Sequence, residues 1–167
     1  MVERNAKLIG VIADTHGLLR PEAVAALQGS DLIVHAGDIG NPRVLEGLRA
    51  IAPVVAVRGN MDESWWAHSL PKSEVIQVAQ RWLYVIHDLD DLDLDPVAAG
   101  FSTVIYGHSH HPSIGMRKGV LLLNPGSAGP RRFELPVSVA LIRVENGLLD
   151  PRLIELAIGR GVKRKLH

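Results

Sequence analysis

Five short segments of the sequence carry aspartate, asparagine and histidine in patterns that could bind metal ions. They are Asp14-Thr15-His16, Gly37-Asp38, Gly59-Asn60, His87 and Gly107-His108-Ser109-His110. Carboxylate, amide oxygen and imidazole suit Mn, Fe, Zn or Ni better than soft Cu(I). Cysteine is absent from the 167 residues, which excludes disulfides and thiolate ligands, whereas histidine occurs eight times. Any transition-metal site must therefore use imidazole and carboxylate groups.

The segments follow apolar runs that are typical of strands. Three continuous runs rich in β-branched residues predict buried strands, at residues 8–13, 31–35 and 53–57. Residues 21–27 predict a helix with proline in its first turn, and residues 42–52 predict a second helix with Asn41 as its N-cap. This βαβαβ order implies parallel strands joined by right-handed crossovers.

The second half of the chain is richer in strands. Residues 72–79 and 81–87 predict a hairpin that turns at Gln80. Further strands are expected at 102–106, 120–124, 137–145 and 148–156, with a turn at Asn146-Gly147 between the last two. We therefore expect an α/β fold, a four-layer α-β-β-α sandwich of two mixed sheets flanked by helices. Residues 1–167 predict a single domain, with a core at about 7–156 and a basic, frayed tail at 159–167.

The chemistry-bearing residues lie where five of these strands end. Each segment alone is weak, because an aspartate or a Gly-Asn pair after a strand is more often a turn residue than a ligand. Because they occur together at five successive strand ends, the interpretation as ligands becomes the favoured one. The carboxyl ends of strands in α/β sheets are where ligands bind.

In this order and spacing the five segments resemble the calcineurin-like metallophosphoesterase superfamily. The short chain and the Asn124-Pro125-Gly126-Ser127 segment look most like the compact YfcE-like phosphodiesterases, and the resemblance covers about residues 7–156. It implies two divalent transition-metal ions, with Mn first and Fe, Zn or Ni as alternatives.

The resemblance also implies the role of each ligand. One ion would be held by Asp14, His16 and His110, the other by Asn60, His87 and His108, with Asp38 bridging both. His108 and His110 point to the same side of an extended segment, so one loop can reach two ions ~3.5–4 Å apart. Catalysis is expected to involve Asp38, Asn60 and His108. Asn60, Arg131 and Arg132 are expected to contact substrate, although two surface arginines after a turn are an equal interpretation of Arg131 and Arg132.

The charge of such a site predicts an anionic substrate. Two divalent ions, two coordinating carboxylates and a bridging hydroxide leave a net positive charge, which attracts a phosphate ester. The implied reaction is in-line attack of the metal-bridging hydroxide on phosphorus. A phosphodiesterase acting on small phosphodiesters is the leading hypothesis. A phosphomonoesterase or nucleotidase would use the same metals, and a retromer subunit uses the same fold, with degraded metal ligands, as a protein-binding scaffold.

Two positions depart from the family pattern. Many members have histidine after the motif asparagine, where it can protonate the leaving group, whereas this chain has Met61, which has no proton to give. The nearest alternative donors are Asp62, His35 and His111. For each of them a non-catalytic role is favoured: a loop cap for Asp62, an orienter of Asp38 for His35 and a rim residue for His111.

The second departure is Asp88, where the family often has glycine. Asp88 opens an acidic run to Asp95 that is either a solvated loop with helix-capping aspartates or an extra cation site, and the first is favoured. Trp65 and Trp66 could wall the cleft, pack beneath it or contact another subunit, and core packing is the default for tryptophan.

Composition bears on partners and location. Lys and Arg together number 18, as do Asp and Glu, so the formal net charge is zero and nucleic acid is not an expected partner. No run approaches the ~20 apolar residues of a membrane helix, and residues 1–13 do not form a signal peptide, so cytoplasmic residence is expected. The resemblance also implies a homo-oligomer.

Overall fold

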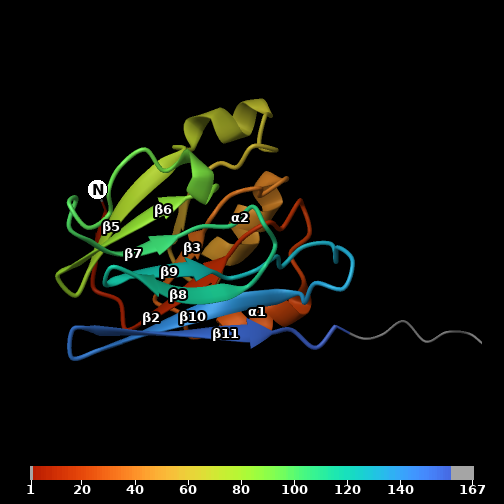
Figure 1. The fold of residues 1–167 in the computed structure, drawn as a ribbon. Helices are drawn as coiled ribbons and strands as arrows, with labels where there is room; N and C mark the ends of the chain where they lie inside the picture. The colour runs from red at the N-terminus through yellow and green to blue at the C-terminus, as the bar shows by residue number, and fades with distance from the viewer. Residues whose placement is uncertain (1, 159–167) are drawn as a thin grey trace, which may run out of the picture.

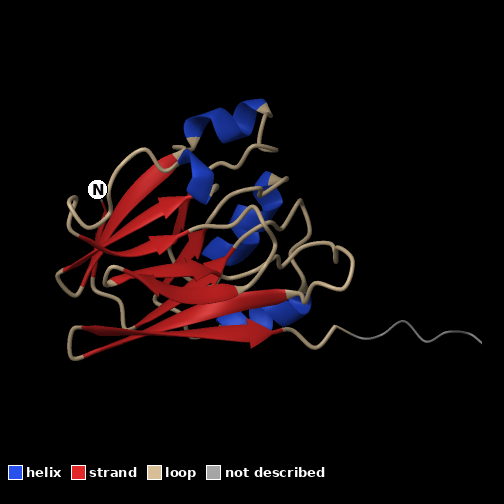
Figure 2. Cartoon of the chain, in the orientation of Figure 1, coloured by secondary structure: helices blue, strands red, loops and turns tan. Residues whose placement is uncertain are grey.

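Two mixed β-sheets pack face to face in the computed structural model, which describes residues 2–158 (Figures 1 and 2). One sheet has six strands in the order β1 (Val2–Arg4), β5 (Ser73–Val78), β6 (Arg81–Ile86), β7 (Phe101–Ile105), β9 (Val120–Asn124) and β8 (Ser113–Arg117). The other has five, in the order β11 (Leu148–Glu155), β10 (Ser138–Glu145), β2 (Leu8–Ile12), β3 (Leu32–His35) and β4 (Val54–Ala56). The predicted α/β fold with two mixed sheets is confirmed.

The core between the sheets explains why the central strands are apolar throughout. Ile9 and Val11 of β2 are fully buried against Val85 of β6 and Ile105 of β7 in one cluster. Ile12 belongs instead to the cluster on the outer face of the five-stranded sheet. Strand β2 is therefore buried on both faces, as its continuous apolar run predicts.

Two helices cover the outer face of the five-stranded sheet. Helix α1 (Pro21–Leu27) begins with proline, and α2 (Pro42–Arg49) begins after Asn41, whose side chain accepts a hydrogen bond from the backbone N–H of Arg43. The predicted N-cap is thus confirmed. Leu27, Leu45 and Leu48 pack against this sheet. Helix α2 ends at Arg49, three residues before the predicted Ala52, because Ile51 and Ala52 both donate to Leu48 O in a closing turn.

The outer face of the six-stranded sheet carries a thinner layer. It consists of the one-turn 3₁₀ helix η2 (Leu89–Asp91) and the rest of the acidic run. Three leucines of this run pack against Tyr84, Ile86 and Val104: Leu89, Leu92 and Leu94. The acidic run is thus amphipathic, with leucines on the sheet and aspartates outward.

The turns follow the sequence pattern. Ala79 and Gln80 have φ of 50° and 62°, and Asn146 and Gly147 have φ of 51° and 73°. Positive φ at both central residues is the geometry of two-residue hairpin turns, and both predicted hairpins form. A further 3₁₀ helix, η1 (Trp65–Ser69), follows the loop after β4.

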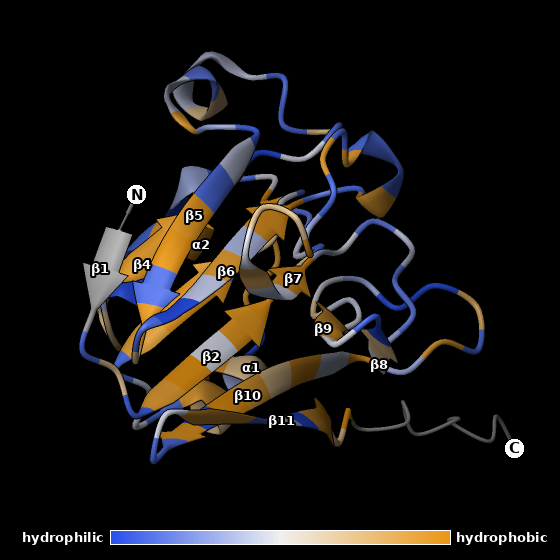
Figure 3. Ribbon diagram, turned by 60° about the vertical axis from the view of Figure 1, so that its left-hand side comes forward, coloured by the Kyte–Doolittle hydropathy of each residue, from blue (hydrophilic) through white to orange (hydrophobic). Residues whose placement is uncertain are grey.

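Parallel pairing brings the functional loops to one edge. Strands β2, β3 and β4 are mutually parallel, as are β6, β7 and β9. Their carboxyl ends carry polar loops beside apolar strands (Figure 3). Among residues 2–158 no helix is long and apolar enough to cross a membrane. The predicted tail at 159–167 lies outside the described residues.

Candidate metal centre

The seven predicted ligands come together from five loops at this edge. The loops after β2, β3, β4, β6 and β7 respectively supply Asp14 and His16, Asp38, Asn60, His87, and His108 and His110. Six of the seven fall into two groups whose ligand atoms lie within 4.8 Å of one another, namely Asp14, His16 and His110, and Asp38, His87 and His108. The first group has the residues that the resemblance implies for one ion, and the second has Asp38 beside His87 and His108, two of the three residues implied for the other ion.

The first group surrounds a buried carboxylate oxygen. His110 Nε2 lies 3.5 Å and His16 Nε2 3.9 Å from Asp14 Oδ1, and the two imidazole Nε2 atoms are 3.4 Å apart. Asp14 is fully buried, and among the described residues its Oδ1 has no hydrogen-bond partner. A buried carboxylate oxygen without a partner is costly, and a bound cation would relieve that cost.

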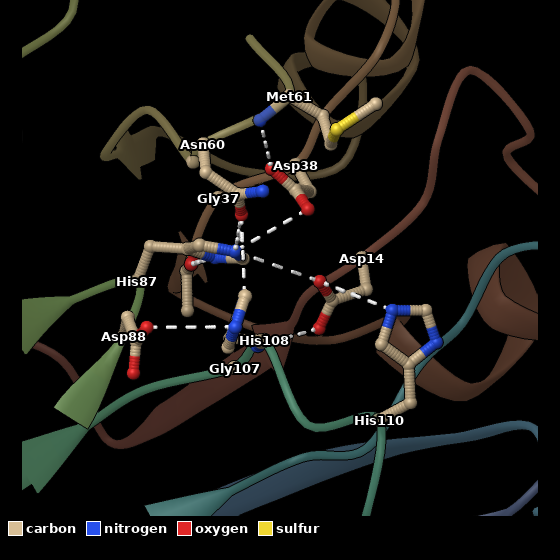
Figure 4. A network of polar contacts seen from close by, with 12 residues as sticks. Asp14, Gly37, Asp38, Asn60, Met61, His87, Asp88, Gly107, His108 and His110 are labelled. Carbon is tan, nitrogen blue, oxygen red and sulfur yellow. Dashed lines mark hydrogen bonds and ion pairs between the residues drawn. The ribbon is translucent and has the colours of Figure 1, made fainter. Parts of the chain in front are cut away.

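The second group converges on the side chain of Asn60. Asn60 Oδ1 lies 3.1 Å from His87 Nε2 and 3.2 Å from His108 Nδ1 (Figure 4). Asp38 Oδ2 is 3.3 Å from the same His87 nitrogen. Donor atoms at such separations suit neighbouring ligands of one ion, which sit at about 2.1 Å from it.

Asp38 lies between the two groups. Its Oδ2 is 3.3 Å from His87 Nε2 and 3.8 Å from His16 Nε2. Its Oδ1 accepts a hydrogen bond of 2.9 Å from the backbone N–H of Met61, which leaves Oδ2 facing both groups. This placement is compatible with a bridging carboxylate. The residues therefore fit two divalent transition-metal ions in ligand type, spacing and unsatisfied charge.

The backbone that presents these side chains is strained. Asp14, His16, Asp38, His108 and His110 all have φ between 46° and 72°, a left-handed conformation that non-glycine residues rarely adopt. Such strain persists only where surrounding structure over-determines it, and it clusters at functional sites. The loops are therefore held in a conformation that their own preferences do not favour.

Close backbone approach explains the glycines beside the ligands. A Cβ at Gly59 would collide with the carboxylate and the backbone nitrogen of Asp38. A Cβ at Gly37, where φ is +99°, would lie 2.6 Å from His87 Nδ1. Only glycine leaves room at these two positions.

A second layer of hydrogen bonds orients the ligands. His87 Nδ1 is 2.7 Å from the carbonyl oxygen of Ala36, so its Nε2 faces the centre. The carboxylate of Asp62 accepts from the backbone N–H groups of Ile39, Gly40 and Gly59. The loop-capping interpretation of Asp62 is thus confirmed, and its oxygens are occupied.

His35 is locked as a neutral imidazole. Its Nδ1 accepts from the backbone N–H of Gly37, and its Nε2 donates to Thr15 Oγ1, which itself donates to Ile39 O. Burial, with a smaller contribution from the positive charge of His87, lowers the pKa of His35 to about 3. His35 therefore supports the loops on either side of Asp38 and has no proton to deliver. His111, by contrast, is exposed at the rim.

The pKa values of the two aspartates are shifted in opposite directions. Burial raises the pKa of Asp14 to about 7, and the Asp38 carboxylate adds to the rise while His87 opposes it. Burial also acts to raise the pKa of Asp38, but contacts with His87 and the Met61 N–H outweigh it and lower that pKa. His87 shows the reciprocal effect, since Asp38 raises its pKa against the influence of burial.

The histidines of the first group stay neutral. Burial lowers the pKa of His110 to about 4, and the positive charge of Arg132 is the next largest cause. Burial also lowers the pKa of His16, where Arg132 contributes as well. Neutral imidazole is the form that binds metal ions. Arg132 therefore lies within electrostatic reach of the first group.

A cavity of about 500 Å³ adjoins the second group. Asn60, His87 and Asp88 form its inner side, Arg58 and Lys72 bring positive charge, and Asp91 and Asp93 bring negative charge. The sequence analysis did not identify Arg58 or Lys72, although Arg58 directly precedes the Gly59-Asn60 motif. Trp66 packs with the helix-side cluster, whereas Trp65 is 85 % exposed.

Known proteins share both sequence and fold with this chain. The model of the calcineurin-like phosphoesterase superfamily domain matches residues 8–147. A probable metallophosphoesterase of Methanothermobacter thermautotrophicus is 36 % identical over 172 residues, covering 96 % of this chain and 98 % of the relative.

Solved structures of lower identity show the same fold. A novel archaeal phosphodiesterase matches with a TM-score of 0.75 at 20 % identity, over 89 % of this chain and 99 % of the other. Vacuolar protein sorting 29 of Cryptosporidium parvum matches at 0.71 and 18 %, over 92 % and 99 %. The E. coli phosphoesterase Yfce matches at 0.64 and 21 %, over 89 % and 99 %. On the family model and the relative at 36 % identity, this chain belongs to the calcineurin-like phosphoesterase superfamily.

Proposed function

We propose that this protein is a dinuclear metal-dependent phosphodiesterase that hydrolyses small phosphodiesters. The observation that carries the proposal is the buried Asp14 Oδ1, which has no hydrogen-bond partner among the described residues and is ringed by imidazoles. With Asp38 between the two histidine groups, the arrangement has the donors for two ions. Manganese is the first candidate, and iron, zinc and nickel are alternatives.

The proposed chemistry divides between bound ions and protein groups. Two divalent ions, when bound, would supply an activated water at neutral pH and would stabilise charge on the phosphoryl oxygens. Asp38 and Asn60 fix the ligand frame, and the His108 loop closes it, since the His108 backbone N–H donates to Asp14 Oδ2 at 3.0 Å. Arg132 is positioned to attract an ester phosphate to the first group.

The surroundings support a small phosphodiester rather than a nucleic acid. The cavity beside the second group carries charges of both signs and has room for one alcohol portion of a diester. Three acidic side chains on its wall, Asp88, Asp91 and Asp93, repel a polyanion.

A turnover assay tests the proposal. Wild-type protein supplied with Mn²⁺, Fe²⁺, Zn²⁺ or Ni²⁺ is expected to hydrolyse a bis-aryl phosphodiester, and Asp38→Asn is expected to reduce turnover to background. Arg132→Gln should raise KM more than it lowers kcat, whereas Arg131→Gln, which removes the same charge beside it, should change KM less. The absence of both metal binding and turnover would refute the enzyme proposal.

The monoesterase alternative shares the metal centre and differs only in the pocket. A large preference for an aryl phosphomonoester or a nucleotide over the diester would favour it. The protein-binding scaffold, with the fold of vacuolar protein sorting 29, is disfavoured because all seven ligand positions are filled by suitable residues in this chain.

A further inference from the structure

Asp88 connects the acidic run to the second ligand group. Its Oδ1 accepts a hydrogen bond of 3.0 Å from the backbone N–H of Asp90, which caps η2. Its Oδ2 lies 3.4 Å from Nε2 of His108 (Figure 4). Each carboxylate oxygen therefore has a separate partner, and the cap holds the second oxygen toward His108.

The other ring nitrogen of His108 faces the ligand group. His108 Nδ1 lies 3.2 Å from Asn60 Oδ1, and the His108 backbone is fixed by its N–H bond to Asp14. A neutral imidazole carries one N–H and one lone pair, so only one ring nitrogen can bind a metal ion. A carboxylate that accepts from one nitrogen leaves the lone pair on the other.

We propose that Asp88 is a positioning residue, which holds His108 in the Nε2-protonated tautomer so that Nδ1 is free to bind the second metal ion. The inference rests on the metal centre of the proposed function. Metal-ligating histidines commonly donate their second N–H to a carboxylate or a carbonyl, which fixes tautomer and ring orientation. His87 already shows this arrangement through Ala36 O.

Asp88→Asn separates this role from helix capping. Asparagine caps as well as aspartate does. Its single side-chain oxygen would be used by the Asp90 N–H, so the NH₂ group would face His108 Nε2. An amide donor there favours a lone pair on Nε2 and moves the proton to Nδ1, where the metal must bind.

The test measures zinc affinity and the histidine tautomer. Calorimetric titration of metal-free protein with Zn²⁺ should show about a 10–100-fold loss of affinity at one of two sites in both Asp88→Asn and Asp88→Ala. The control Asp90→Asn removes the same charge from the same loop and should change affinity by less than about twofold, since exposed charges interact weakly. Long-range ¹H–¹⁵N spectra of zinc-loaded wild type should show His108 protonated at Nε2.

Opposite results overturn the inference. If Asp88 only caps η2, Asp88→Asn will bind zinc like wild type and only Asp88→Ala will be weakened. Zinc bound through His108 Nε2 would also refute it. If wild type binds two zinc ions with the expected tautomer yet hydrolyses no phosphoester, the proposed function fails and the inference stands. If wild type is active and Asp88→Asn retains wild-type affinity, only the inference fails.

Discussion

At the scale of single residues, Asp14 has the environment that most needs a cation. Its carboxylate is fully buried, its Oδ1 has no hydrogen-bond partner in residues 2–158, and its pKa is raised to about 7 chiefly by burial. The pKa values of His16 and His110 beside it are lowered, so these imidazoles are neutral and do not compensate the negative charge of the Asp14 carboxylate. The metal-free protein therefore has a group whose ionisation opposes folding.

This environment predicts a pH dependence for the metal-free protein. A carboxyl pKa raised in the folded state contributes stability at low pH that is lost as pH rises through about 7, and the raised pKa of His87 acts in the same direction. The Asp14 contribution to the free energy of unfolding in chelator should therefore fall between about pH 4 and 7, as measured by urea denaturation. His16, His35 and His110 act in the opposite direction, because their lowered pKa values in the folded state add stability as the pH rises through the ordinary histidine value. The Asp14 contribution is therefore obtained as a difference between wild type and a variant without this carboxyl.

Asp14→Asn is the matched variant for that measurement. It keeps side-chain size and removes the titrating carboxyl, so the metal-free variant should lose the Asp14 contribution to the pH dependence and be more stable than metal-free wild type at pH 8. It should also bind metal more weakly at the first group. A difference in unfolding free energy between wild type and Asp14→Asn that stays constant from about pH 4 to pH 8 in chelator would contradict the prediction.

Met61 bears on how the leaving group is protonated. Its side chain is 64 % exposed and has no proton to donate, while His35 and Asp62 are occupied by hydrogen bonds. We expect turnover to fall steeply as the pKa of the leaving alcohol rises, because neither Met61, His35 nor Asp62 can protonate the leaving oxygen. A general acid is typically worth about 10²–10⁴-fold, so Met61→His should accelerate alkyl diesters selectively over aryl ones. Equal wild-type rates for aryl and alkyl diesters would reveal another acid.

At the scale of elements, the parallel strand ends supply the geometry of the centre. Strands β2, β3 and β4 terminate beside one another, and the loops that follow are cross-linked by the Asp14 N–H to Gly37 O and His16 N–H to Asp38 O bonds. Five of the proposed ligands have left-handed backbone, which sets the directions of their side chains. Glycine is required where loop backbones touch.

Gly59→Ala tests that requirement. The added Cβ would meet the Asp38 carboxylate and backbone, so the β4 loop must shift; overpacking of this kind costs about 1–3 kcal/mol. Loss of metal affinity should accompany a lower thermal midpoint. Gly115→Ala in β8 is the control, because nothing lies within 4 Å of a Cβ there and no positive φ is required. Equal behaviour of the two variants would show that close approach to Asp38 is unimportant.

At the scale of the whole molecule, metal binding and folding should be linked. The proposed ligands come from five loops and from both sheets, so only the folded chain can present them together. A ligand at 100 times its dissociation constant stabilises the folded state by about 2.7 kcal/mol per site. For a chain of this size that corresponds to a rise of about 5–10 °C in Tm per site.

Thermal denaturation with and without Mn²⁺ measures this linkage. The rise should be reversed by chelator, and Asp38→Asn, which alters the residue between the two groups, should reduce it. If Mn²⁺ leaves the Tm of wild type unchanged while Zn²⁺ raises it, the centre prefers zinc. If none of Mn²⁺, Fe²⁺, Zn²⁺ and Ni²⁺ raises it, the proposed metal centre is wrong.

Local sequence predicted much of the fold because its signals are local. Proline at the first position of α1 and α2, the Asn41 cap, the Asn146-Gly147 turn and the apolar runs of β2 and β3 depend on nearby residues only. Strands β1 and β8 were not predicted. Strand β8 is mostly exposed and forms the edge of its sheet beside β9, so pairing rather than apolar pattern defines it.

The candidate residues of the centre could be identified from sequence alone, since the five segments carry suitable ligand types at successive strand ends. The roles of the residues around them became visible only in the folded chain. The burial of Asp14, the locked imidazole of His35, the capping by Asp62 and the contact of Asp88 with His108 depend on loops far apart in the chain. The sequence gives the type of each side chain. Burial and hydrogen-bond partners determine protonation and reactivity, and they arise only when the two sheets bring those loops together.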